Sequence, residues 1–279
     1  MSTARSPTGE AQRPTGEELL EVAVEAARMA GGLLAERAAH GRERSVTSKS
    51  TPTDLVSEAD LASQQAIVEL LGRRRPQDGF VGEEGSDNQV EGQSGLSWVV
   101  DPLDGTVNFV FGIPQWCVSV AVREGARTLA GAVYDPNRDE LFTATSEGDP
   151  LLTHSEGTVA LSGSAREEMA TAMVATGFAY EARVREAQAK VFARLIGRVR
   201  DIRRFGAAAL DLAWTACGRF DAYYERTVKQ WDIAAGALIC ERAGLQVLEL
   251  PVHKHLPWGI LAAPPALAGP LLEVVGAPA

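Results

Sequence analysis

The sequence predicts a fold of mixed α+β and α/β class, with an antiparallel sheet in the first half and alternating strands and helices in the second. Apolar runs between 116 and 145 are separated by turn residues, which is typical of an antiparallel meander. Beyond Gly148, strand patterns alternate with longer helical stretches. The 279 residues suit one large unit or two parts sharing an interface, because single cores stop growing at roughly 250–300 residues. We therefore expect a flexible tail at 1–14, an α+β half at 15–150 and an α/β half at 151–279.

The first half begins with two helices that carry clear start signals. Thr15 and Glu18 have the spacing of a capping box, and apolar residues recur after them at helical intervals. Ser57 and Asp60 introduce a second helix in the same way. The expected helices are 17–39 and 57–71, and the expected strands are 80–81, 97–100, 116–123, 128–134 and 140–145.

The second half shows the periodicity of strands that alternate with helices. We expect strands at 172–176, 221–224, 246–250 and 259–263, and helices at 181–198, 207–217, 233–242 and 265–275.

The composition excludes several classes of protein. A net charge of −10 disfavours nucleic acid and anionic membranes as partners, because both bind a basic face. No apolar window reaches the ~18 residues of a membrane span, and the polar N-terminus lacks the apolar core of a signal peptide. Cys117, Cys217 and Cys240 stand singly in apolar surroundings, which favours reduced core cysteines over a disulfide or zinc site. We expect a cytoplasmic protein.

The strongest functional signal is the segment 98–106, where an apolar strand runs into two acids, Asp101 and Asp104. Carboxylates at a strand edge can bind a metal, and a bound cation would let this negatively charged chain receive a phosphate. Gly105 permits close backbone approach, so the N–H groups near Thr106 could face that phosphate. The alternative is a plain turn with a helix cap, since these residue types are common in turns.

Three further acidic clusters accompany this segment. Glu83 and Glu84 follow a buried strand, Asp232 precedes an apolar helix, and a loop at 54–60 contains two Asp residues and a Glu. Each cluster also has an ordinary structural explanation, as a solvated turn, an N-cap or a capping box.

Together the four clusters resemble the signature of the inositol monophosphatase family, whose blocks occur in the same order. The matching blocks are the acidic loop, Gly82-Glu83-Glu84, Asp101-Pro102-Leu103-Asp104-Gly105-Thr106 and Trp231-Asp232-Ile233-Ala234-Ala235-Gly236. The resemblance covers about 17–272. It implies a layered αβαβα sandwich of the sugar phosphatase type, a Mg²⁺-dependent phosphomonoesterase, sensitivity to Li⁺ and a homodimer.

The resemblance also implies a metal site with two or three Mg²⁺ ions. Ligands made only of oxygen, without His or Cys, suit Mg²⁺ on chemical grounds as well. Asp101 would bridge two ions. The implied ligands are Glu83, Asp101, Asp104, Asp232 and the main-chain carbonyl of Leu103.

The catalytic residues implied by the resemblance are Asp60, Thr106 and Glu83. Thr106 and Asp60 match the pair that orients the attacking water and helps to deprotonate it. Lys49, Asp54 and Glu84 are possible auxiliary residues around the metal site.

The implied substrate pocket centres on Glu225, which stands where inositol-specific members carry a Glu. A polyol hydroxyl could donate a hydrogen bond to this carboxylate. Ala207 replaces the Ser or Thr of many members, which removes one possible hydroxyl contact. The full set is Asp104, Gly105, Thr106, Gly206, Ala207, Glu225 and Asp232.

Inositol monophosphate is therefore the first expected substrate. Histidinol phosphate is the second, because Glu225 could equally bind an ammonium group. Relatives also hydrolyse fructose 1,6-bisphosphate and 3′-phosphoadenosine 5′-phosphate, and a shared fold cannot choose among these esters. A non-enzymatic alternative is a binding partner of RNA or the transcription machinery, supported only by arginines at 73–75 and 198–204, which are more often solvated helix ends.

Overall fold

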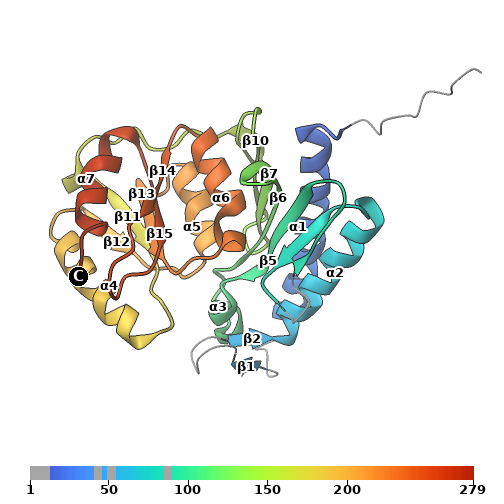
Figure 1. Ribbon diagram of the computed structural model, residues 1–279, viewed down its shortest axis with the longest axis horizontal. Helices are drawn as coiled ribbons and strands as arrows, with labels where there is room; N and C mark the ends of the chain where they lie inside the picture. Colours follow the sequence, from blue (N-terminus) through green and yellow to red (C-terminus); the bar gives the residue numbers. More distant parts are fainter. Residues whose placement is uncertain (1–12, 41–45, 49–54, 85–88) are drawn as a thin grey trace, which may run out of the picture.

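The computed structural model describes residues 13–40, 46–48, 55–84 and 89–279. The chain forms five layers, in which two outer helical layers and a central helix pair enclose two β-sheets (Figure 1). This arrangement confirms the expected layered αβαβα sandwich. Most of the expected tail at 1–14 lies outside the described residues, so the tail stays a prediction.

The first outer layer consists of α1 (Gly16–Ala39) and α2 (Glu58–Arg74), which pack against each other beside the larger sheet (Figure 1). Both helices begin with the predicted capping boxes. In α1 the Glu18 carboxylate accepts a hydrogen bond from the Thr15 N–H at 2.7 Å. In α2 the Asp60 carboxylate accepts one from the Ser57 N–H at 2.8 Å, so two backbone donors that the helix cannot satisfy find partners.

The larger sheet has eight strands in the order β10-β9-β8-β7-β6-β5-β3-β4. Its β3 and β5 run parallel, whereas the other neighbours are antiparallel. The hairpin of the last two strands extends the predicted meander beyond residue 150, and sequence reasoning did not foresee it. The strands are β3 (Gly79–Gly82), β4 (Gln89–Val90), β5 (Leu96–Asp104), β6 (Cys117–Glu124), β7 (Arg127–Asp135), β8 (Glu140–Thr145), β9 (Leu151–His154) and β10 (Gly157–Ala160).

Two small elements lie below this sheet in Figure 1. The strands β1 (Val46–Ser48) and β2 (Leu55–Ser57) form a separate antiparallel ribbon. The short helix α3 (Thr106–Phe111) follows β5 directly.

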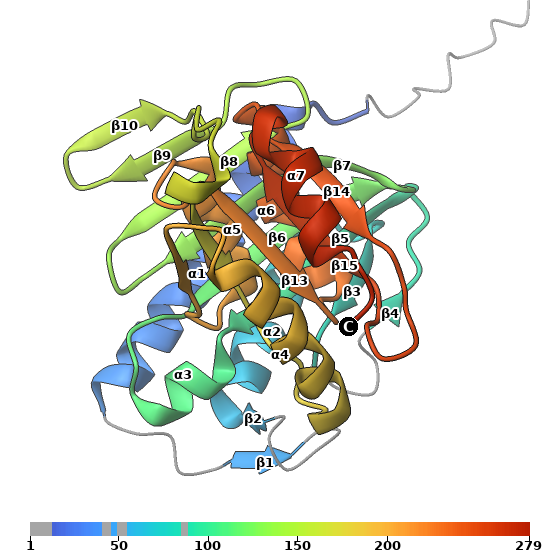
Figure 2. The ribbon, with the colours of Figure 1, turned by 90° about the vertical axis from the view of Figure 1, so that its left-hand side faces the viewer.

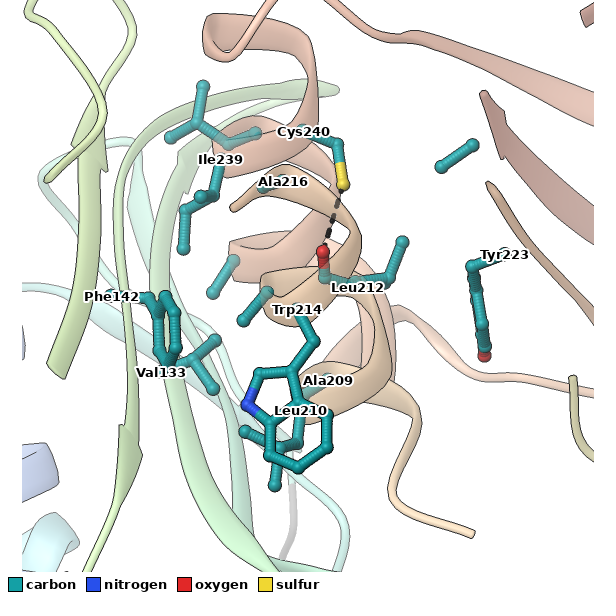
Figure 3. Packing of buried hydrophobic residues seen from close by; sticks show 14 of the residues in the cluster. Val133, Phe142, Ala209, Leu210, Leu212, Trp214, Ala216, Tyr223, Ile239 and Cys240 are labelled. Carbon is teal, nitrogen blue, oxygen red and sulfur yellow. Dashed lines mark hydrogen bonds between the residues drawn. The ribbon is translucent and has the colours of Figure 1, made fainter. Parts of the chain in front are cut away.

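The central layer is the helix pair α5 (Ala208–Ala216) and α6 (Gln230–Arg242), which lies between the two sheets (Figure 1). Figure 3 shows α5 and α6 with Val133 and Phe142 of the larger sheet on one side and Tyr223 of the smaller sheet on the other. The Cys240 thiol donates a hydrogen bond to the Leu212 carbonyl at 3.2 Å, which joins the two helices.

Small residues allow α6 to approach its neighbours closely. A Cβ placed on Gly131 of β7 would lie 2.8 Å from the Ala235 Cα, and one on Gly236 would lie 2.6 Å from the Leu212 Cβ. Real Cβ atoms do not pack this closely. The Ala-Ala-Gly of the Trp-Asp motif thus has a packing role beside its place next to the site.

The smaller sheet has five strands in the order β12-β11-β13-β15-β14. Its outer face is covered by α4 (Ala182–Ile196) and α7 (Pro265–Val275), which lie in front of the sheet in Figure 2. The strands are β11 (Met173–Thr176), β12 (Asp201–Arg203), β13 (Ala222–Arg226), β14 (Gln246–Leu250) and β15 (Gly259–Ala263). A 3₁₀ turn at Met169–Thr171 precedes them.

The three cysteines are unpaired, as the sequence predicted, and Cys117 and Cys240 are buried. Within the described part of the chain, no helix is long and apolar enough to cross a bilayer. The division of the chain at 150 stays a prediction, although the hairpin at 151–160 pairs with β8 of the larger sheet.

Candidate active site

Strand pairing brings the acidic clusters at Glu83 and Asp101 together. Because β3 and β5 are parallel neighbours, with Gly82 opposite Val100, their carboxyl ends meet at one edge of the sheet. Glu83 follows the first strand at this point and Asp101 lies next in the second. The sequence order of the motifs therefore becomes a spatial cluster.

A cavity of about 630 Å³ opens at this edge and is lined from both sheets. Most predicted site residues meet there, although they come from chain segments far apart in the sequence. The predicted residues that line it are Glu83, Asp101, Leu103, Asp104, Gly105, Thr106, Gly206, Glu225 and Asp232.

The cavity gathers negative charge that the surrounding protein destabilises. Burial, followed by the charges of neighbouring carboxylates with Glu83 first, raises the pKa of Asp101 well above its usual range. Burial and then the charge of Glu83 raise the pKa of Asp232 in the same direction. A cluster of acids that oppose one another's ionisation is suited to a divalent cation, which would reverse the local field.

Asp104 connects this edge of the larger sheet to the central layer. Its Oδ1 accepts a hydrogen bond from the Ala208 N–H at 3.0 Å, and its Oδ2 accepts one from the Ala209 N–H at 2.8 Å. These donors are free N–H groups of the first turn of α5. Burial raises the pKa of Asp104 to about 6, and these hydrogen bonds limit the rise. Oδ1 accepts one bond here, which leaves it a lone pair for a cation.

The predicted water-activating pair is in direct contact. The Thr106 hydroxyl donates a hydrogen bond to the Asp60 Oδ1 at 2.7 Å, while the Ser57 hydroxyl donates to the Asp60 Oδ2 at 2.6 Å. Asp60 is fully buried. It therefore caps α2 and contacts the threonine at once, so the structural and functional explanations of this residue are compatible.

Gly105 enables the turn that presents Thr106. Its φ of +92° is a left-handed conformation, and an added Cβ would lie 2.9 Å from the Gln115 carbonyl oxygen. Only glycine avoids both problems. The turn connects β5 to α3 and exposes the backbone of this motif to the cavity.

The cavity is also lined by Glu225 of β13. Its Oε2 accepts a hydrogen bond from the buried Tyr223 hydroxyl at 2.9 Å. Its carboxylate lies against the Cα of Gly177, where any Cβ would overlap it. Burial raises the pKa of Glu225 to about 7, although the Tyr223 hydrogen bond and then the positive charge of Arg204 lower it.

Several lining residues were not anticipated from the sequence. Arg204, Lys229 and the segment 178–181 all face the cavity. Asp211 lies in α5, fully buried, with no hydrogen-bond partner for either carboxylate oxygen within the described ranges. Burial, then the charge of Glu225, raises the pKa of Asp211 well above its usual range. The signal that could have identified Asp211 is that it is the one acid in the otherwise apolar helical run 208–216.

Other predicted residues lie elsewhere. Lys49 and Asp54 lie outside the described residues. Glu84 is buried away from the cavity, with its backbone N–H and carbonyl bonded to the side chain of Gln64. Ala207 is buried beside the lining residues as the N-cap of α5, and its side chain makes no capping bond.

The donor chemistry of the cavity fits Mg²⁺, because every candidate ligand atom is oxygen. Across the described ranges, no three acidic, histidine or cysteine side chains are arranged to share an ion as they stand.

The layered sandwich and the acidic cavity lined from both its sheets define the fold class of the sugar phosphatases. The model of the Inositol monophosphatase family matches residues 16–272. The chain therefore belongs to the inositol monophosphatase family and is a phosphatase of that family.

Individual relatives span nearly the whole chain. Inositol-1-monophosphatase SuhB of Mycobacterium tuberculosis is 41% identical over 263 residues, covering 91% of this chain and 90% of its own. A Pasteurella multocida protein named Nus factor SuhB is 39% identical over 262 residues, covering 92% and 95%. The solved structure of Mycobacterium tuberculosis SuhB superposes with a TM-score of 0.79 at 36% identity, covering 94% of this chain and 97% of that one.

Proposed function

We propose that this protein hydrolyses inositol monophosphate to inositol and phosphate with the help of two or three Mg²⁺ ions. The observation that carries the proposal is the convergence of four acids, from distant chain segments, on one cavity that also contains Glu225. The residues that would hold the ions are Glu83, Asp101, Asp104, Asp232 and the carbonyl of Leu103.

Bound Mg²⁺ would supply the positive charge that binds the phosphate and makes a water molecule acidic. The protein residues have separate tasks. Thr106 uses its single proton in the bond to Asp60, so its oxygen lone pairs remain able to accept a hydrogen bond from the attacking water. Asp60 accepts the hydrogen bond of the threonine hydroxyl. It could therefore take that proton when the threonine receives one from the attacking water.

The alcohol part of the substrate would bind at the other end of the cavity. Glu225 accepts one hydrogen bond from Tyr223, and its remaining lone pairs can accept a hydroxyl group of the substrate. A carboxylate with a raised pKa benefits from such a donor, because a hydrogen bond to the ionised form offsets its desolvation.

The decisive experiment is a phosphate-release assay with a panel of esters. We expect inositol 1-phosphate to be hydrolysed faster than histidinol phosphate, fructose 1,6-bisphosphate and 3′-phosphoadenosine 5′-phosphate, and only with Mg²⁺. Full activity in excess EDTA would refute the metal requirement, and a clear preference for another ester would refute the substrate. From the family resemblance we further propose a homodimer, testable by light scattering, and inhibition by millimolar Li⁺ at subsaturating Mg²⁺.

The name Nus factor, which two relatives carry, supports a second candidate function as a binding protein. The arginines that could form a basic surface are partly neutralised here. Arg74 pairs with Glu25, Arg75 with Asp78 at 2.8 Å, and Arg203 with Asp201 at 2.6 Å. Salt-dependent retention of RNA by the purified protein would support this function, and its absence at low salt would exclude RNA binding.

A further inference from the structure

Arg204 places a positive charge in the same cavity as the carboxylates. It stands between β12 and α5, in the loop that includes Gly206, and it lines the cavity together with Glu225. Its guanidinium lies against the Cα of Gly206, whose φ of +82° is left-handed. The glycine therefore permits the turn and leaves the space that the arginine occupies.

The charge of Arg204 acts on the alcohol end of the cavity. It favours the ionised forms of Glu225 and of the buried Asp211. No hydrogen bond or ion pair engages its guanidinium among the described residues. A guanidinium carries five N–H donors, so Arg204 presents donors beside a carboxylate that presents acceptors.

This pairing discriminates between classes of alcohol. A hydroxyl group both donates and accepts, so neighbouring hydroxyls can bind Arg204 and Glu225 together. An ammonium group only donates, and it would be attracted by Glu225 but repelled by Arg204. A second phosphate only accepts, and it would be attracted by Arg204 but repelled by Glu225 and the other cavity acids. Each wrong group thus meets a like charge, which is an effective means of specificity.

We propose that Arg204 and Glu225 form a dipolar subsite that selects a neutral alcohol with neighbouring hydroxyls over an aminoalcohol or a bisphosphate. The inference rests on the proposed phosphatase function of the same cavity. It adds Arg204 as a specificity-determining residue and gives the physical reason why histidinol phosphate should be a poor substrate.

The test compares Arg204→Met with Arg203→Met. Both replace an arginine of the same segment by an apolar side chain of similar length, but Arg203 pairs with Asp201 and does not line the cavity. Steady-state kinetics would be measured with inositol 1-phosphate, histidinol phosphate and fructose 1,6-bisphosphate. Binding of the first two would be measured by calorimetry, with Ca²⁺ in place of Mg²⁺ to prevent turnover.

For Arg204→Met we expect kcat/KM for inositol 1-phosphate to fall about tenfold or more, mainly through KM, because one charged donor is lost. Histidinol phosphate should bind more tightly to the same variant, because the repulsion is removed. Arg204→Lys keeps the charge without the planar fork. It should therefore still exclude histidinol phosphate while binding inositol 1-phosphate more weakly. Arg203→Met should match the wild type for all three esters.

Two outcomes would overturn the inference. If Arg204→Met changed all three esters equally, the arginine would have no role in specificity, and if this variant bound histidinol phosphate no more tightly than the wild type does, Arg204 would not exclude an ammonium group. The proposed function fails separately. If the wild type hydrolysed no ester, the phosphatase function would be refuted. If its calorimetric preference for inositol 1-phosphate were nevertheless lost in Arg204→Met, the subsite would be supported.

Discussion

Glu225→Gln should make the metal-free protein more stable, although we expect the same change to weaken substrate binding. The folded protein raises the pKa of Glu225 from its ordinary 4.5 to about 7. Folding therefore binds this proton more tightly than the unfolded chain does, so the wild type loses stability as the pH rises from about 4.5 to about 7. Gln is neutral at every pH and can still accept the hydrogen bond from Tyr223, so the variant escapes this loss.

The magnitude follows from the size of the pKa change. Each tenfold difference in proton affinity is worth about 1.4 kcal/mol, so the rise corresponds to about 3 kcal/mol above pH 7. Part of the side chain faces the cavity, where water screens the charge, so we expect a gain of about 2–3 kcal/mol at pH 8. At pH 5, where Glu225 is already protonated in the folded state, the gain should shrink to about 1 kcal/mol or less.

Urea denaturation in EDTA, at pH 5 and pH 8, measures this directly. The matched control is Glu249→Gln, an exposed acid of β14, which should change the free energy of unfolding by less than about 0.5 kcal/mol at both pH values. If Glu225→Gln were no more stable than the wild type at pH 8, or equally stabilised at both pH values, the reasoning from burial would be refuted. The same variant should bind inositol 1-phosphate more weakly.

Three further predictions concern the remaining parts of the site. Asp101→Asn should lower kcat by several orders of magnitude while the circular dichroism spectrum stays unchanged, because it removes a charge that the proposed ions need. If a higher Mg²⁺ concentration alone restored the activity, Asp101 would contribute to ion affinity and not to the chemical step. Thr106→Ala should lower kcat by about a hundredfold or more, and Thr106→Ser should recover much of it, because the hydroxyl contact to Asp60 returns; equal activity of the two variants would exclude the hydroxyl. Gly131→Ala should destabilise the fold by about 1–3 kcal/mol and also reduce activity, because it displaces the helix that carries Asp232. The control is Gly72→Ala in α2, where an added Cβ meets nothing within 4 Å. This variant should leave the free energy of unfolding unchanged or raise it.

The sequence predicted the regular elements well where local signals were strong. The capping boxes at Thr15 and Ser57 marked the starts of α1 and α2, and periodicity located α4 to α7 within a few residues. The hairpin of β9 and β10 was missed, because the exposed β10 has no apolar face to produce an alternating pattern. The ribbon of β1 and β2 was missed because such short strands give too few residues for periodicity to be recognised.

The candidate site shows the same limit at the level of residues. Acids in compact motifs, such as Asp101 and Asp104, could be selected from sequence because their spacing is unusual. Arg204 could not, because a single charged residue in a loop has no distinctive pattern, and Asp211 was marked only as the one acid in the apolar helical run 208–216. Their importance arises from tertiary packing, which brings them next to Glu225, and only the fold provides that information.

The placement of α5 and α6 has a consequence for cutting the chain. Both helices belong to the second half of the sequence, yet they pack against β6 and β7 of the first half, and Gly131 contacts Ala235 directly. A fragment ending at residue 150 would lose these helices and expose the apolar face of its sheet to water, at a cost of about 25 cal/mol for each Å² uncovered. We therefore expect the halves to melt in a single cooperative transition and neither to be recovered as a folded fragment after proteolysis, so the two halves would be units of sequence but not of stability.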